Sequence, residues 1–226
     1  MKLILTCEHG GNDIPKPYQP YFKGSQLVLN SHRGFDLGAL DLFKTLEPLA
    51  DYTLHSEISR LLIELNRSLH HPKLFSEFTK TLSKADKSAL IQSHYLVYRN
   101  QVETTICQWI ESGEPVLHIS VHSFTPILNN TERHADIGLL YDSKNIVEKA
   151  FCKTFKNALK TVNPNLNVRF NYPYLGKADG FTTYLRKQFT SNYIGIEIEV
   201  NQKYVANTQL QTELKTSIFS ALKNFN

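Results

Sequence analysis

The sequence predicts an α/β fold in which helices flank a central, mostly parallel sheet. Short apolar runs that are typical of buried strands alternate along the chain with segments of helical periodicity. Strands separated by helices form parallel pairs, because each connection must cross over the sheet. A chain of 226 residues is long enough for one such domain with a well-buried core. We therefore expect residues 1–226 to form a single domain.

In the first half of the chain, the apolar run at 3–7 predicts the first strand, and a proline-rich loop at 15–20 follows it. The segments 52–58 and 61–65 are expected to be extended. A helix is predicted from about residue 36, because apolar residues recur there at three-residue steps: Leu37, Leu40, Phe43 and Leu46.

The second half begins with a long helical region at 84–108. Its apolar stripe is formed by Ile91, Tyr95, Tyr98, Val102 and Ile106. The remaining strands are expected at 116–121, 137–141, 167–171 and 194–198, and the remaining helices at 145–162, 180–188 and 210–224.

Composition and charge exclude several classes of protein. The net charge of +4 is small and scattered, which does not favour nucleic acid as a partner. No apolar stretch approaches the ~20 residues of a membrane span. The sequence leaves the oligomeric state open.

The cysteines indicate the compartment. Cys7, Cys107 and Cys152 are odd in number and widely spaced, which argues against a disulfide framework and favours the reducing cytoplasm. Cys7 lies beside the predicted site and could be a nucleophile, but a small buried strand residue is the more common role for such a cysteine.

Three predicted strands end on side chains that can bind a metal or transfer a proton. His9 follows the first strand, His122 follows the strand at 116–121, and Glu199 follows the strand at 194–198. Ligands of open α/β sheets bind at the carboxyl ends of the strands. The three positions therefore predict an active site at this edge.

Metal binding is the first chemistry that these residues suggest. A catalytic zinc ion has three protein ligands and one open position, and histidine and carboxylate ligands suit it. His9 and His122 are the best candidates. His118 lies four residues before His122, which is ~13 Å along a strand, so one metal cannot bind both.

The third ligand is expected from a loop or a helix start. Asp36 is the favoured candidate, since Gly34 indicates a loop that bends into the helix carrying this carboxylate. An acidic residue stabilised by the helix dipole is an equally good interpretation of Asp36. The competing ligands are Glu8, Asn12, Asp13 and His32.

The remaining candidates are two glutamates and a group of cationic residues. Glu197 and Glu199 lie two residues apart, so both point to one face of a strand, and either could be a general base. A solvated edge strand would give the same pattern. Arg67 follows an apolar run and could bind a carboxylate through two hydrogen bonds. Further substrate-binding candidates are Asn66, Arg60 and Arg186.

Taken together, the motifs resemble those of the N-formylglutamate amidohydrolase family. They occur in the family's order over nearly the whole chain: 6–12 (TCEHGGN) with Pro15, 32–39 (HRGFDLGA), 59–60 (SR) with 65–67 (LNR), 120–126 (SVHSFTP), 138–141 (GLLY), 179–180 (DG) and 195–202 (GIEIEVNQ).

The resemblance implies a zinc-exopeptidase-like fold with a central mixed, mostly parallel sheet between helices, related to the zinc carboxypeptidases and aspartoacylase-like enzymes. It also implies zinc-dependent hydrolysis of an N-acyl amino acid such as N-formylglutamate. The implied metal ligands are His9, Asp36 and His122, the implied base is Glu199, and the implied carboxylate clamp is Asn66 with Arg67. The carboxypeptidase-type His-x-x-Glu motif would require Glu at position 12, where this chain has Asn12.

Two rival hypotheses remain open. A non-catalytic protein that binds zinc or a small carboxylate would keep the histidines and the clamp, but it would not need Glu199. A cysteine hydrolase would use Cys7 with His9 or His122 and would not need a metal.

Overall fold

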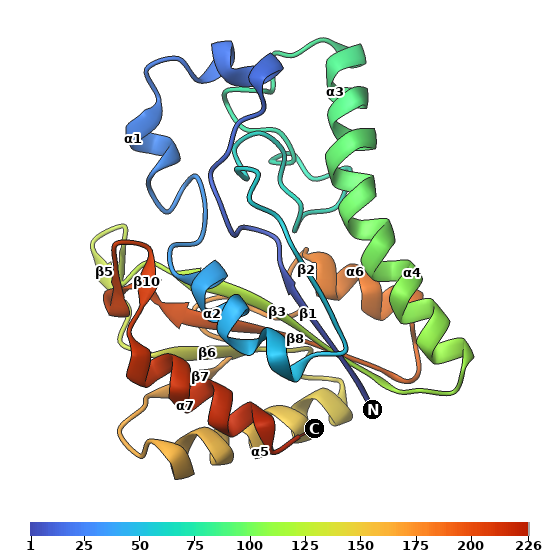
Figure 1. Cartoon of the computed structure of the whole chain (residues 1–226), viewed down its shortest axis with the longest axis vertical. Helices are drawn as coiled ribbons and strands as arrows, with labels where there is room; N and C mark the ends of the chain where they lie inside the picture. The colour runs from blue at the N-terminus through green and yellow to red at the C-terminus, as the bar shows by residue number, and fades with distance from the viewer. Residues whose placement is uncertain (226) are drawn as a thin grey trace.

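Six strands form the central sheet, in the order β2-β1-β3-β8-β6-β7. Figure 1 shows this sheet in the computed structural model, which describes residues 1–225. β6 and β8 run antiparallel and the other neighbouring pairs run parallel, which confirms the predicted mixed, mostly parallel sheet. The strands are β1 (Lys2–Cys7), β2 (Tyr52–His55), β3 (Val116–Phe124), β6 (Ile137–Leu140), β7 (Val168–Phe170) and β8 (Tyr193–Asn201).

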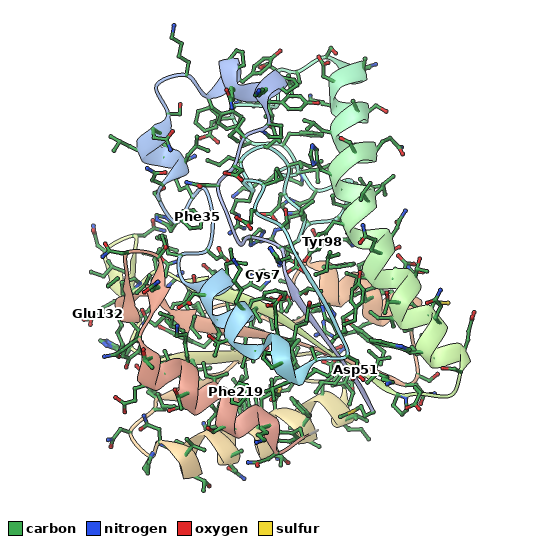
Figure 2. The ribbon with its side chains drawn as sticks, viewed as in Figure 1. Cys7, Phe35, Asp51, Tyr98, Glu132 and Phe219 are labelled. Carbon is green, nitrogen blue, oxygen red and sulfur yellow. The ribbon has the colours of Figure 1, made fainter. Side chains whose placement is uncertain are left out.

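Helices cover both faces of the sheet (Figure 1). On one face, α2 (Ala39–Leu46), α5 (Ile146–Val162) and α7 (Thr212–Lys223) share an apolar core with β1, β3 and β8. On the other face, α4 (Val97–Glu111) packs against β3 and α6 (Phe181–Gln188) packs against β8. Figure 2 shows Cys7 in the interior, where it is completely buried in the first of these cores.

Side chains along β3 alternate between the two faces, as the geometry of a strand requires. The odd-numbered positions 117–121 are apolar and join the core under α2, α5 and α7. The even-numbered positions carry His118, Ser120 and His122, all buried on the opposite face. The register of β3 with β8 places Glu197 beside Ser120 and Glu199 beside His122. One face of the sheet is therefore polar at its centre.

A further layer lies beyond the carboxyl ends of β1 and β3 (Figure 1). It contains η1 (Lys16–Phe22), α1 (Gln26–Leu29), the irregular segment 56–83, and a long helix that begins at α3 (Lys84–Leu90) and continues through the π-helical η3 (Ile91–Leu96) into α4. A second apolar cluster joins this layer to α4 and α6. This layer encloses the strand ends at which the site was predicted.

The main error in the predicted elements is the extended segment 61–65. These residues are buried in the second apolar cluster, but they form turns and no strand. Local hydrogen bonds such as Leu62 N to Ser59 O replace strand pairing there. The proline-rich loop is a 3-10 helix, and the helix expected from residue 36 begins at Ala39, after Gly38 with φ of 81°. The other predicted strands and helices are confirmed to within a few residues at their ends.

Several short elements were not predicted. They are the hairpin of β4 (Ile127–Leu128) with β5 (Thr131–Glu132), the hairpin of β9 (Val205–Ala206) with β10 (Gln209–Leu210), α1, η2 (Glu47–Leu49) and η4 (Gln202–Tyr204). None of the helices within residues 1–225 combines the length and the apolar character that crossing a bilayer requires.

Candidate active site

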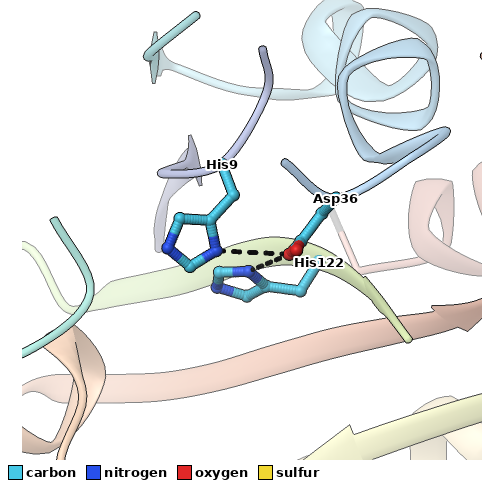
Figure 3. Close-up of side chains that lie close together, drawn as sticks. All are labelled: His9, Asp36 and His122. Atoms are coloured by element: carbon cyan, nitrogen blue, oxygen red, sulfur yellow. Dashed lines mark hydrogen bonds and ion pairs between the residues drawn. The ribbon is translucent and has the colours of Figure 1, made fainter. Parts of the chain in front are cut away.

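His9, Asp36 and His122 come from three separate segments of the chain and meet at the carboxyl end of the sheet (Figure 3). His9 follows β1, His122 lies near the end of β3, and Asp36 lies three residues before α2. Nδ1 of His9 is 3.3 Å and Nδ1 of His122 is 2.9 Å from the same Asp36 oxygen, Oδ2. All three side chains are buried, and their potential ligand atoms lie within 4.8 Å of one another.

The loop before α2 brings Asp36 to the two imidazoles. The backbone N–H of Asp36 donates to the carbonyl of His9, at 2.9 Å, which ties the loop to the end of β1. Gly34 allows the chain to pass close to α1, because a Cβ at this position would lie 2.0 Å from the carbonyl oxygen of Leu29. A larger residue at position 34 would therefore displace the loop that carries Asp36.

Each imidazole contacts a second carboxylate on the side that faces away from Asp36. Nε2 of His9 makes a short hydrogen bond with Oε1 of Glu64. Nε2 of His122 lies 3.2 Å from Oε2 of Glu8 and 2.8 Å from Oγ of Ser120. These contacts fix the ring orientations, with both Nδ1 atoms directed at Asp36.

The buried carboxylates keep their negative charge. Burial alone would raise the pKa of Glu8, but the hydrogen bond and positive charge of His122 outweigh it and hold the pKa well below its usual range. The pKa of Glu64 is lowered in the same way, chiefly by the Arg60 charge acting against burial. The pKa of Asp36 is also well below its usual range, since the charge of His9 and hydrogen bonds from both imidazoles overcome its burial. Three ionised carboxylates therefore lie around the two imidazoles, with the Arg60 charge beside two of them.

Arg60 connects two of these carboxylates. Its Nη1 donates to Oδ1 of Asp36 at 3.1 Å, and its Nε and Nη2 donate to Oε2 of Glu64 at 2.9 and 2.6 Å. Arg60 faces the cavity, but its guanidinium is engaged with the residues around the imidazoles. This geometry favours support of Asp36 and Glu64 over direct contact with a ligand.

Glu197 and Glu199 lie on one face of β8, as predicted, but their surroundings differ. Oε1 of Glu197 accepts a hydrogen bond from Oγ1 of Thr182, at 2.7 Å. Oε2 of Glu199 is the one completely buried side-chain oxygen or nitrogen without a hydrogen-bond partner in the part of the chain that the structure describes. Burial and the nearby charges of Asp36 and Glu197 raise the pKa of Glu199 to about 8, although the charge of His122 opposes the shift. Glu199 can therefore exchange a proton near neutral pH.

A cavity of about 200 Å³ joins these residues. It lies at the carboxyl ends of β1, β3 and β8, where open α/β folds bind their ligands. Its volume is small for a ligand pocket, which favours a small substrate. Its walls are formed by His9, Asp36, Arg60, Asn66, Arg67, His122, Ser123, Tyr174, Leu175, Ala178, Asp179, Glu197 and Glu199.

Asn66 and Arg67 form one wall of the cavity. Oδ1 of Asn66 accepts a hydrogen bond from the backbone N–H of Phe181 at 2.6 Å. Nη1 of Arg67 donates to the carbonyl oxygen of Asp179, and within residues 1–225 this is the one hydrogen bond made by the guanidinium. The remaining N–H groups of Arg67 are available to a ligand in the cavity.

The competing third ligands lie outside this arrangement. Asn12 and Asp13 line a separate groove. His32 is exposed, although it is close to Asp36 in sequence. Glu8 contacts the far side of His122 and does not line the cavity.

His118 and Arg186 also lie outside the cavity lining. His118 is held between Oγ1 of Thr6 at 2.8 Å and the hydroxyl of Tyr193 at 2.7 Å. Arg186, a predicted substrate-binding residue, forms an ion pair with the buried Glu148 at 2.7 Å and donates to backbone carbonyls. Through these contacts Arg186 stabilises the packing of α6 against β8.

Glu64 was not singled out from the sequence, although it contacts both His9 and Arg60. The feature of the sequence that could have identified Glu64 is its position as the one carboxylate inside the apolar run of 61–65. A buried carboxylate is costly unless it is paired, so such a residue points to a partner elsewhere in the chain. The partner itself could not be identified before the fold was known.

Comparisons with known proteins identify the family and the fold. A family model described as N-formylglutamate amidohydrolase matches residues 1–206. The structure of a gene product from Agrobacterium tumefaciens is similar, with a TM-score of 0.79 and 24% identity over 99% of this chain and 91% of that chain. An N-formylglutamate amidohydrolase from Ralstonia eutropha has a TM-score of 0.73 and 15% identity, over 100% of this chain and 92% of that chain.

A metallo-carboxypeptidase from Burkholderia cenocepacia aligns with a TM-score of 0.40 and 11% identity, over 99% of this chain and 56% of that chain. No curated protein matches the sequence with significance.

Proposed function

The chain belongs to the N-formylglutamate amidohydrolase family, and from this premise we propose that it is a zinc-dependent hydrolase of N-acyl amino acids such as N-formylglutamate. The observation that carries the proposal is the group of His9, Asp36 and His122 at the wall of a small cavity that also contains Glu199 and Arg67. These residues provide a place for a metal, a proton acceptor and a cation for the substrate.

The donor set fits zinc. Two imidazole nitrogens and one carboxylate oxygen are the ligands of a typical catalytic zinc site, which leaves a fourth position for water or substrate. Glu64 and Glu8, behind His9 and His122, are the carboxylate partners that metal-binding histidines commonly have. When bound to this group, zinc would act as a Lewis acid that polarises the substrate carbonyl and lowers the pKa of water.

Glu199 is the proposed general base. Its Oε2 is buried without a hydrogen-bond partner among residues 1–225, and a buried polar atom of this kind is destabilising unless a ligand binds it. The raised pKa of Glu199 is close to neutrality, so the carboxylate can take a proton from the attacking water and give it to the leaving amine. Glu197 is held by Thr182 and is less suited to this exchange.

Arg67 and Asn66 are the proposed clamp for the substrate α-carboxylate. Arg67 lines the cavity, and within residues 1–225 its guanidinium makes one hydrogen bond, to Asp179. A charge-assisted pair of hydrogen bonds from its other N–H groups would orient the substrate carboxylate. When the α-carboxylate is held, the N-acyl amide is also held next to His9, Asp36 and His122. The reaction then becomes effectively intramolecular. Arg60 would support Asp36 and Glu64 in this arrangement.

The two rival hypotheses have less support. Cys7 is completely buried in the apolar core and does not line the cavity. Burial, with the charges of Glu8 and Asp36, raises its pKa well above the usual value, so the thiol is not activated as a nucleophile. A non-catalytic binding protein would explain the histidines and Arg67, but it gives no role to the unpaired oxygen of Glu199.

The cysteines also bear on where the enzyme acts. Cys7, Cys107 and Cys152 are all free. Free thiols are typical of reducing compartments, and we place the enzyme in the cytoplasm on this ground.

One experiment tests the proposal as a whole. The purified protein is analysed for bound metals and assayed for release of the amino acid from N-formylglutamate and other N-acyl amino acids, before and after treatment with a chelator. The proposal expects bound zinc, turnover of at least one such substrate, loss of turnover on chelation and recovery with zinc. Turnover that survives complete removal of metal would contradict the metal role, and bound zinc without turnover would favour the binding protein.

A further inference from the structure

Arg99 is a buried arginine that forms no ion pair with any residue in 1–225. Only 3% of its surface is exposed. Burial lowers the pKa of its guanidinium, which reflects the cost of holding this charge away from water. Burying a charge lowers the stability of the fold unless the charge is paired and hydrogen-bonded. Because Arg99 has no carboxylate partner in the described part of the chain, other contacts must stabilise its guanidinium.

Three aromatic rings surround the guanidinium. Its Cζ lies 4.1 Å from the centroid of Phe181, 4.6 Å from that of Tyr184 and 4.9 Å from that of Tyr95. Cation–π contacts with desolvated rings stabilise the charge without a counter-ion. They also connect α4, which contains Arg99, to α6, which contains Phe181 and Tyr184.

The N–H groups of Arg99 are directed at the turn that carries the proposed clamp. Its Nη1 donates to the carbonyl oxygen of Leu65 at 3.0 Å and to that of Arg67 at 3.4 Å. The hydroxyl of Tyr95 donates to the same Arg67 oxygen at 2.7 Å. The two carbonyls stand on either side of Asn66, so one guanidinium fixes the backbone at both ends of the Asn66–Arg67 pair.

The side chains of the same pair contact the start of α6, and Nδ2 of Asn66 also lies 3.4 Å from Nε2 of His122. Asn66 accepts from the N–H of Phe181, and Arg67 donates to the carbonyl of Asp179. The backbone of the pair is thus fixed from α4, and its side chains are fixed at the start of α6. An apolar side chain of similar size at position 99 would fill the space but would leave both carbonyls without this donor.

We propose that Arg99 is a positioning residue for substrate binding, which holds the Arg67 guanidinium in the place where it meets the substrate α-carboxylate. This inference rests on the proposed function, since it assigns Arg99 to the clamp of that site. Arg99 does not line the cavity and acts through the turn at Asn66–Arg67. A displacement of about 1 Å in a substrate-binding group can reduce a rate ~100-fold, so support of this kind matters for turnover.

The test compares N-formylglutamate with its analogue in which the α-carboxylate is an amide. Arg99→Met is expected to lower kcat/KM for the free acid by about 10- to 100-fold, mainly through KM, and to change kcat/KM for the amide little. Tyr95→Phe removes the other donor to Arg67 and should act in the same direction with a smaller effect. Tyr204→Phe is the matched control, because it removes a tyrosine hydroxyl that binds Asp136, and neither of these residues lines the cavity.

A double-mutant cycle separates positioning from general support of the fold. In an Arg67→Ala background, Arg99→Met should cause no further loss on the free acid, because the group that it positions is gone. Equal losses of Arg99→Met on both substrates, or the same loss with and without Arg67, would overturn the inference. If Arg99→Met does not fold, an unchanged ratio of the two kcat/KM values in Tyr95→Phe would overturn it.

The wild-type enzyme shows whether a failure lies in the clamp or in Arg99. If the wild type cleaves the free acid and the amide equally well, the proposed clamp is wrong and the role of Arg99 is wrong with it. If the wild type prefers the free acid and both variants keep that preference, the role of Arg99 alone is wrong.

Discussion

The Glu8 carboxylate lies 3.2 Å from Nε2 of His122, on the side of the ring that faces away from Asp36. This contact fixes Nδ1 as the nitrogen of His122 that is directed at Asp36 and the proposed metal site. We predict that Glu8→Gln weakens zinc binding by roughly 10- to 100-fold, the usual effect of removing such a partner. Competition with a chelator of known affinity measures the change. Glu57→Gln alters a half-exposed carboxylate and serves as the control; an unchanged zinc affinity in Glu8→Gln would contradict the proposed orientation.

The two histidines should be required for metal binding. We predict about one zinc per chain in the wild type, and little or none in His9→Ala or His122→Ala, because each variant leaves two protein ligands. Elemental analysis after dialysis gives the metal content. His118→Gln is the matched control, since His118 is bound to Thr6 and Tyr193 outside the cavity. Full zinc content in both alanine variants would show that the site lies elsewhere.

The two glutamates of β8 should differ in their effect on turnover. Glu199→Gln is expected to lower kcat by roughly 10² to 10⁴, the usual range for a general base, while zinc content and fold are retained. Glu197→Gln should have a smaller effect, because Glu197 is already held by Thr182. Steady-state kinetics on the best N-acyl amino acid would test this order. A larger loss in Glu197→Gln would reverse the assignment.

Loss of the clamp should depend on the substrate. Arg67→Ala leaves the α-carboxylate unmatched, which should cost ~2 to 5 kcal/mol in transition-state binding. Activity on an N-acyl amino acid should therefore fall by orders of magnitude, while activity on the α-amide should change little. Comparison of kcat/KM for the two substrates measures the difference. Similar losses on both would assign Arg67 to the fold or to the surroundings of the metal.

His118 should make the fold sensitive to mild acid. Burial lowers its pKa to about 4, from 6.5 for an exposed histidine. Between these pH values the unfolded chain binds the extra proton, so the free energy of unfolding falls as the pH drops from about 6.5 to about 4. The expected loss from this residue at pH 5 is about 2 kcal/mol.

Urea denaturation of the wild type and of His118→Gln, at pH 8 and at pH 5, isolates this contribution. The stability advantage of the wild type over the variant should be about 2 kcal/mol smaller at pH 5 than at pH 8. An advantage that does not change with pH would show that His118 is not buried in its neutral form.

The strand ends were predictable because their signal is local. His9, His122 and Glu199 each follow an apolar run, and parallel strands bring their carboxyl ends to one edge of the sheet whatever their order. The order itself was not predictable, since it depends on long-range pairing. The antiparallel placement of β6 beside β8 is an example, because no local pattern in residues 137–140 distinguishes it from a parallel strand.

The sequence was least informative where burial occurs without regular hydrogen bonding. The apolar run at 61–65 has the composition of a strand, but it packs in the layer beyond the sheet and forms turns. The same limit applies to Glu64 and Arg99, whose roles depend on partners far away in the sequence. Arg186 was one of the candidates for substrate binding. The sequence around a single arginine does not show whether its side chain forms a buried ion pair or binds a ligand.

The polar face of β3 has a consequence for how the chain folds. A one-residue slip of β3 against β1 or β8 would exchange its two faces and place His118, Ser120 and His122 in the apolar core under α2, α5 and α7. Misaligned sheets are thus penalised by several buried polar groups at once. His122 of the proposed site, together with His118 and Ser120, therefore also specifies the correct alignment of the central strands during folding.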